Sequence, residues 1–276
     1  MSDGTGVGVL RMARKQFWGN CHLCGEYKKL SFEHVPPHAA FNNRPLVARA
    51  IDEVLEKGSV DNAKRQVFQR GAGAHTLCEK CNNDTGRWYG RDFVEWTYKG
   101  LQILTLADGT PSLHYTFHIL PLRVIKQIVC MFFSVNSSGV LRNTKPELAK
   151  FVLDKQRKYL PDDVRIYAFY AVGSAMRQSP LWGKFKTSGT FRKSLFSEIT
   201  FIPFGYVLGF DDPPDSALLD ISFFARYRYD DYEPLHLRLP VLPVVSYFPG
   251  DYRTQKQIDK AVEENAQHAR NRRSRS

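Results

Sequence analysis

The chain has 276 residues, a formal net charge of +11, 43% hydrophobic residues and five cysteines. The apolar content is sufficient for a packed core, which excludes a disordered chain, and the few, unevenly spaced cysteines exclude a disulfide-built secreted domain. The positive charge favours a polyanionic partner. The N-terminus lacks the charge-then-apolar pattern of a signal peptide, and the most apolar later stretch is interrupted by Arg123 and Lys126. The sequence therefore predicts a cytoplasmic protein that has reduced thiols and does not enter a membrane.

The first third of the chain differs in character from the rest. Residues 1–16 are glycine-rich and predict a flexible lead-in. Residues 17–98 hold four of the five cysteines. Within them, Pro45–Lys57 has helical spacing and meets a glycine stop at Gly58, and an amphipathic helix of about five turns is expected after Cys78.

From residue 99 to residue 269 the pattern alternates between strand-like and helical segments, which predicts a mixed α+β domain. A basic tail of residues 270–276 follows. The expected helices are Pro121–Val135, a segment from a Thr144 cap to about Tyr159, and Arg253–Ala269. The expected strands are Leu113–Leu120, Val164–Val172, Phe191–Phe210 and Leu219–Tyr229. Leu235–Ser246 is expected to be an edge strand or an extended segment because of its prolines.

Two CxxC turns stand out in the N-terminal third. They are Cys21-His-Leu-Cys24 and Cys78-Glu-Lys-Cys81. Each turn points two thiolates at one place, and two turns complete a tetrahedral site for structural Zn2+. The fifth cysteine, Cys130, lies in an apolar helical segment and is expected to be a core residue.

Polar residues suited to catalysis follow each turn. Glu33 and His34 end a strand-like segment after the first turn, and Asn82, Asn83 and Asp84 come directly after the second. A shared zinc ion would bring these two segments together, although almost fifty residues separate them. A carboxylate and an amide oxygen suit Mg2+ or Mn2+ better than Zn2+, so a second and different ion is expected here.

The run CHLC…FEHVPP…LCEKCNNDTG resembles the zinc-knuckle HNH endonucleases over residues 17–98. The resemblance implies a treble-clef-like ββα-metal module in which His34 is the general base. It also implies that Glu33 and Asn82 hold the catalytic ion, with Asn83 and Asp84 as further candidates. Phosphodiester cleavage needs such a base and such a cation at the developing charge.

The chain departs from the family's pattern before the second knuckle. The family has a middle asparagine there that orients the base, whereas this chain reads Arg70-Gly-Ala-Gly-Ala-His75. Three substitutes remain open, namely His75, a backbone carbonyl or Asn62. His38, four residues beyond His34, is a further candidate for contact with a phosphate.

The positive charge lies mainly outside this segment. Residues 1–98 carry 14 Lys and Arg against 11 Asp and Glu, whereas the rest of the chain carries 25 against 17. Basic and aromatic residues alternate in two C-terminal stretches, which favours contact with nucleic acid but is equally typical of a solvated strand face. The basic candidates are Lys184, Lys186, Arg192, Lys193, Arg226 and Arg228, the last two on one face of a strand.

The sequence thus predicts a metal-dependent HNH endonuclease that acts on nucleic acid, with double-stranded DNA as the expected substrate. A role as a restriction or defence effector is one interpretation, in which the C-terminal domain senses a ligand or regulatory protein. The sequence leaves open whether the chain forms a homo-oligomer. The alternative is a non-catalytic zinc module that binds nucleic acid or a protein. The missing middle asparagine favours this alternative.

Overall fold

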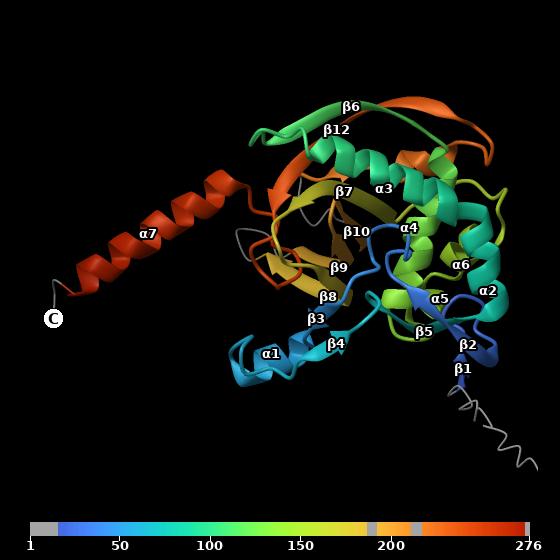
Figure 1. The fold of residues 1–276 in the computed structure, drawn as a ribbon, viewed down its shortest axis with the longest axis horizontal. Helices are drawn as coiled ribbons and strands as arrows, with labels where there is room; N and C mark the ends of the chain where they lie inside the picture. The colour runs from blue at the N-terminus through green and yellow to red at the C-terminus, as the bar shows by residue number, and fades with distance from the viewer. Residues whose placement is uncertain (1–15, 187–191, 211–216, 274–276) are drawn as a thin grey trace, which may run out of the picture.

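The computed structural model describes residues 16–186, 192–210 and 217–273. Its N-terminal part holds a three-stranded antiparallel sheet in the order β1-β2-β5 and a small β3-β4 sheet (Figure 1). Helix α2 follows β5 directly, so this part has a hairpin followed by a helix. Its elements are β1 (Phe17–Asn20), β2 (Tyr27–His34), β3 (Leu46–Ala48), α1 (Ile51–Lys57), β4 (Gln66–Phe68), β5 (Gly73–Cys78), α2 (Glu79–Thr85), the π-helical turn η1 (Gly86–Gly90) and α3 (Arg91–Leu104).

The remainder is built on a larger mixed sheet in the order β6-β12-β7-β10-β9-β8, with β11 paired to β7. The predicted α+β class is confirmed. The elements are β6 (Ser112–Ile119), α4 (Pro121–Val135), α5 (Val140–Thr144), α6 (Pro146–Leu153), β7 (Val164–Val172), β8 (Arg177–Lys186), β9 (Arg192–Phe201), β10 (Phe204–Phe210), β11 (Leu219–Asp220), the 3-10 helix η2 (Ser222–Arg226), β12 (Glu233–Pro243) and α7 (Gln255–Arg273).

Helix α4 lies at the centre of the molecule. Pro121 at its first position supplies a helical φ, and all but two of its residues are buried. The helix contacts η1 and β5 on one side and β8, β9 and β10 of the large sheet on the other. One hydrophobic core therefore contains side chains from both sides of residues 98–99, and α3 runs through that point.

Several predicted elements are confirmed. Strand β7 and helix α4 have the predicted bounds, and β6 begins and ends one residue early. Glycine ends α1 as expected, with Gly58 at φ 67° in the left-handed region. However, α1 begins at Ile51 rather than Pro45, because Leu46–Ala48 pairs with β4 as a strand.

The predicted helix cap at Thr144 is wrong. Thr144 is the last residue of α5, and its hydroxyl donates to the Val140 carbonyl. Pro146 begins a separate helix, because the residue before a proline is disfavoured in the helical region and Lys145 has φ −137° and ψ 69°.

The predicted strand Leu219–Tyr229 is also wrong beyond Asp220. The Asp220 carboxylate accepts the N–H of Ser222, and the chain then turns into η2 with Phe224 fully buried. Arg226 ends η2 and Arg228 lies outside any strand, so these two residues do not share a strand face.

Strand β12 is not the predicted edge strand, because it lies between β6 and β7. It pairs with β6 along Glu233–Pro240 and with β7 only along Val241–Pro243. Over most of its length it therefore has one strand neighbour in the described part of the chain, and proline is tolerated on the other side.

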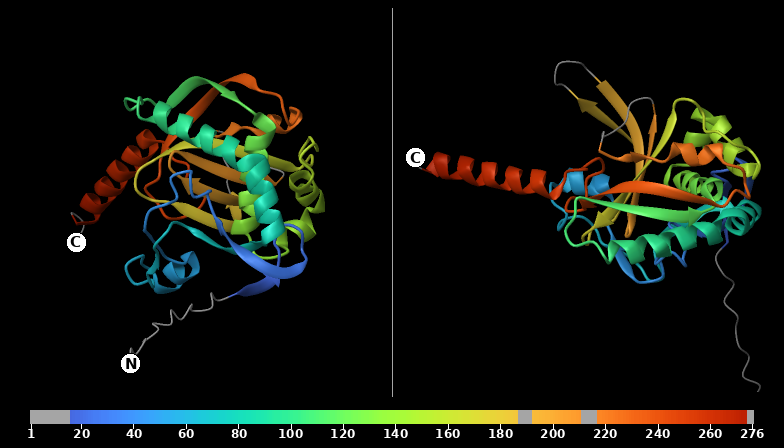
Figure 2. Two further views of the ribbon diagram at one scale, coloured as in Figure 1. Left: turned by 45° about the vertical axis from the view of Figure 1, so that its right-hand side comes forward. Right: turned by 90° about the horizontal axis from the view of Figure 1, so that it is seen from above.

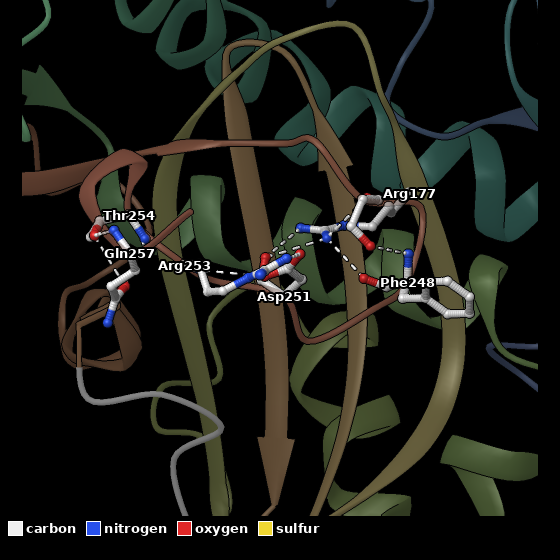
Figure 3. A network of polar contacts seen from close by, with 7 residues as sticks. Arg177, Phe248, Asp251, Arg253, Thr254 and Gln257 are labelled. Atoms are coloured by element: carbon white, nitrogen blue, oxygen red, sulfur yellow. Dashed lines mark hydrogen bonds and ion pairs between the residues drawn. The ribbon is translucent and has the colours of Figure 1, made fainter. Parts of the chain in front are cut away.

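A buried ion pair fastens the segment before α7 to the large sheet. Arg177 of β8 pairs with the fully buried Glu198 of β9 at 2.6 Å. The Nη1 atom of Arg177 also donates to the carbonyls of Ser246 and Phe248, of which Phe248 is labelled in Figure 3. Glu198 in turn accepts the N–H of Gly250 at 2.9 Å. These partners offset the cost of burying both charges. Beyond them α7 projects away from the rest of the molecule (Figure 2).

Among the residues that the structure describes, no helix combines the length and the apolar character that crossing a membrane requires.

Candidate metal centre and active site

The two CxxC turns come together at one end of the β2–β5 hairpin. The first turn closes through hydrogen bonds from the Gly25 N–H to the Cys21 carbonyl and from the Cys21 N–H to the Glu26 carbonyl. Gly25 has φ 79°, a left-handed conformation that favours glycine. The second turn joins the last residue of β5, Cys78, to Cys81 in the first turn of α2.

The four cysteine sulfurs lie within 4.8 Å of one another, and the Cys24 and Cys78 sulfurs are 3.9 Å apart. A tetrahedral Zn2+ with bonds of about 2.3 Å separates its sulfur ligands by about 3.8 Å. The donor set therefore fits structural zinc. In the described part of the chain, these cysteines are the one group of three or more His, Cys, Asp or Glu residues that can hold a metal.

The protein prepares one of these sulfurs as a thiolate. The pKa of Cys21 is lowered to about 4, because the Cys81 thiol and several backbone groups hydrogen-bond to its sulfur. The N–H of Cys78 is one of these donors, at 3.3 Å. Three of the four cysteines are buried, and Cys24 is half-buried. Thiolate character and a closed environment are what a structural metal centre requires.

The knuckle is also fastened to the central helix. His22, between two of the cysteines, donates a ring N–H to the Phe133 carbonyl of α4 at 3.0 Å. Cys130 of α4 is fully buried among apolar residues, as predicted for a core cysteine, and burial raises its pKa. The fifth cysteine is thus separate from the metal centre.

Glu33 lies at the other end of the same hairpin and is only 6% exposed. Burial raises its pKa to about 8. The carboxyl faces α4, where its charge contributes to the raised pKa of Cys130. No hydrogen bond or ion pair reaches this carboxyl from the described residues. With this pKa the carboxyl is protonated near pH 7 and needs no partner, and a bound cation would displace that proton and use the carboxylate as a ligand.

His34 is the next residue and the last of β2. Its Nε2 lies 3.0 Å from the backbone carbonyl oxygen of Arg70. Because a carbonyl oxygen only accepts, Nε2 carries the proton and Nδ1 of the neutral ring has a free lone pair. Burial lowers the pKa of His34 below its ordinary value of 6.5, which keeps the ring neutral near pH 7. A backbone carbonyl thus orients the ring, one of the three substitutes predicted for the missing asparagine.

Asn82 of α2 reaches back to the strand that carries Glu33 and His34. Its amide nitrogen donates to the Ser31 hydroxyl at 3.0 Å and to the Phe32 carbonyl at 3.3 Å. The amide oxygen accepts no hydrogen bond from the described residues. The same amide group is bonded to the carbonyl of Phe32, the residue before Glu33. Its free oxygen is suitable as a ligand for a hard cation.

The two further metal candidates on α2 are less well placed. Asp84 pairs with Lys80 at 2.6 Å and with Arg87 at 3.0 Å on the surface of the helix. Asn83 is exposed.

Glu33, His34 and Asn82 make no hydrogen bond or ion pair with one another in residues 16–186. Consecutive residues of a strand point to opposite faces, so Glu33 points toward α4 and His34 toward the open face of the sheet. The exposed His38 lies on this open side, with its ring centroid 5.0 Å from that of His34. His75 of β5 stacks on Phe17 at 3.7 Å instead of contacting His34.

Asn42 is a site residue that the sequence interpretation missed. It is 1% exposed, and its amide nitrogen donates to the carbonyls of Pro36 and Ala72 while its oxygen accepts the Ala72 N–H. These bonds join the loop after His34 to the loop that carries the Arg70 carbonyl. The only sequence signal was the pair of asparagines that follows the His34 motif. Asparagine is common in turns, so this signal does not single out Asn42.

The predicted basic surface is only partly described. Lys184 and Lys186 lie on β8, opposite Ser194 and Arg192 of β9, and Lys193 is opposite Phe185. These positions form the end of one hairpin. Their side chains are outside the described part of the structure. Arg226 and Arg228 lie elsewhere, at and after η2.

Comparisons with protein-family models, with curated proteins and with solved structures found no match to this chain.

Proposed function

We propose that the chain is a metal-dependent endonuclease that hydrolyses phosphodiester bonds in nucleic acid. The observation that carries the proposal is the state of His34. A carbonyl oxygen at Nε2 fixes the tautomer, and a lowered pKa keeps the ring neutral. The free Nδ1 is therefore available to take a proton from an attacking water.

Two further oxygen donors support the same function. The buried carboxyl of Glu33 and the free amide oxygen of Asn82 would hold Mg2+ or Mn2+, which keeps several waters and binds substrate phosphate. When bound, the ion would stabilise the negative charge that develops on the phosphate in the transition state. Asn82 fixes the Phe32 carbonyl and so positions the end of β2, and Asn42 fixes the loop beyond it.

The test is nicking of supercoiled plasmid in Mg2+ or Mn2+. The His34→Ala variant is expected to lose about 100- to 10,000-fold in rate, the usual contribution of a general base, while its zinc content stays unchanged. The matched control is His114→Ala, which removes an exposed histidine on β6. In the wild type the rate is expected to fall as pH drops through the lowered pKa of His34, since the base must be neutral. Undiminished nicking by His34→Ala would exclude the mechanism.

A second candidate function is a non-catalytic zinc module that binds nucleic acid or a protein. The burial of Glu33, at 6% exposure, favours it, because a ligand for a substrate-bound metal needs access. Binding of nucleic acid without nicking in either metal would support this candidate over the nuclease.

A further inference from the structure

The open face of the β1–β2–β5 sheet carries a continuous row of five rings. Successive ring centroids are 3.7, 5.3, 4.8 and 5.0 Å apart. The rings belong to Phe17, His75, Phe32, His34 and His38. The fourth ring of the row is therefore that of His34, the histidine that the proposed function uses as its base.

These rings are held by the backbone of the sheet. His75 is directly opposite Phe32 in the β2–β5 register, and Phe17 is paired with Leu30, two residues from Phe32. The Phe32 ring lies over Gly73, where an added Cβ would be 2.7 Å from its Cε1 atom. A side chain at that position would displace the ring, so the glycine makes room for the row.

The row is accessible to solvent although it is aromatic. Phe17 is 37% exposed and Phe32 is 39% exposed, and His38 is exposed as well. Helices α2 and α4 contact the β2–β5 hairpin, and Glu33 is buried on the side that faces α4. The rings lie on the opposite side, which those helices leave open.

We infer that this row is a stacking platform for the unpaired bases of a nucleic acid, which places their backbone beside His34. The cleavage of the bound strand beside His34 rests on the proposed function, whereas the binding of unpaired bases by the rings does not. Protein rings can stack only on bases that are not already stacked and paired within a duplex. The substrate class is therefore a single strand, or a duplex with unpaired bases, rather than the intact double-stranded DNA that the sequence resemblance implied.

Charge beside the row favours a nucleic acid over a second protein surface. Arg70 is exposed, carries the carbonyl that holds His34, and makes no ion pair among the described residues. Lys28, four residues before Phe32 and on the same strand face, is half-exposed, although it pairs with Glu26. Stacking rings together with nearby cations are the two components of single-strand binding sites.

The test is fluorescence anisotropy of the full chain without added Mg2+ or Mn2+. The probes are labelled oligothymidylate and oligouridylate of about twelve nucleotides, within the range of single-strand site sizes, and a blunt DNA duplex of equal length. The single strands are expected to bind more tightly than the duplex. The two single-strand probes distinguish DNA from RNA.

Variants test whether the aromatic rings are responsible for the binding of single strands. Phe32→Ala is expected to weaken single-strand binding about tenfold, and Phe32→Tyr is expected to restore it, since a ring remains for stacking. Tyr232→Ala removes an aromatic ring that is 63% exposed elsewhere and should change nothing. Zinc content confirms that each variant is folded.

Tighter binding of the duplex, or equal effects of Phe32→Ala on both kinds of probe, would overturn the inference. So would self-association of the chain through this face with no binding of oligonucleotide. Single-strand binding that depends on Phe32 but leads to no cleavage in Mg2+ or Mn2+ would refute the nuclease and leave the platform in place. Cleavage by a protein whose single-strand binding does not depend on Phe32 would refute the platform and leave the nuclease in place.

Discussion

The two ends of the β2–β5 hairpin have opposite designs. At one end, next to the Leu30–Cys78 pair, four cysteine sulfurs converge and most of them are buried. At the other end, next to the His34–Gly73 pair, the side chains have separate surroundings. A backbone carbonyl holds the His34 ring, and the Asn82 amide holds the carbonyl of Phe32. Structural metal sites are closed by protein ligands, whereas catalytic ones keep open positions.

Under the proposed function, one short hairpin would serve folding at one end and chemistry at the other. The cysteine end supplies all of its ligands and ties β5 to α2, so it fixes the register of the hairpin. The histidine end then leaves a free nitrogen on His34 and a free oxygen on Asn82. Unsatisfied groups of this kind reduce stability and remain where function uses them.

The largest expected effect comes from breaking the closed end. Cys81→Ser removes one of four ligands, and structural zinc contributes on the order of 10 kcal/mol to the folding of small modules. Loss of bound zinc and a lower midpoint of thermal unfolding are expected, because the N-terminal part shares one hydrophobic core with the rest of the chain. Elemental analysis and circular dichroism measure the two effects.

Cys130→Ala is the matched control for that variant. It removes a fully buried thiol from α4 without touching the metal centre. It should keep its zinc and lose only about 1 kcal/mol of stability from the small cavity. A similar loss of zinc in both variants would contradict the separation of the fifth cysteine from the other four.

An intermediate effect is expected at the open end from Asn42→Ala. The substitution leaves the Pro36 carbonyl and the Ala72 N–H without their partner, whereas the Ala72 carbonyl still accepts the N–H of Val35. A loss of about 3 kcal/mol in the free energy of unfolding is expected, with zinc retained. Denaturant unfolding measures it, and an unchanged midpoint would show that the loop near His34 needs no such clamp.

The smallest effect is expected from Asp84→Ala. Its carboxylate is engaged with Lys80 and Arg87 on the surface of α2, so it is not expected to hold the catalytic ion. Surface ion pairs of this kind contribute about 0.5 kcal/mol. Plasmid nicking within about twofold of the wild type is expected. A loss as large as that of His34→Ala would return Asp84 to the list of metal ligands.

The closed end could be predicted from the sequence, and the open end only in part. Cysteine spacing alone indicates a shared metal, because thiolate ligands have few other reasons to recur in pairs. The burial of Glu33 could not be predicted, since it depends on α4, whose Cys130 lies almost a hundred residues along the chain. The orientation of His34 depends on a backbone carbonyl, which every residue has.

The same distinction holds for the fold. Helix α4 and strand β7 are predominantly apolar from end to end, so their pattern decides their bounds. In contrast, Leu219–Tyr229 has strand-like composition but turns at Asp220, because one carboxylate captures a backbone N–H and Phe224 is needed in the core. Local propensity cannot foresee such a tertiary preference.

The central claim is that the hairpin carries two metal centres with different ions and separate ligands. The most direct measurement is calorimetric titration of Mn2+ into the wild type and Glu33→Gln, with zinc counted in both. One zinc per chain is expected in both proteins, with Mn2+ binding weakened at least about tenfold in the variant. Because Mn2+ must displace a proton from Glu33, its affinity for the wild type should rise with pH up to about 8. Equal Mn2+ binding in the two proteins, or loss of zinc with Glu33→Gln, would contradict the account.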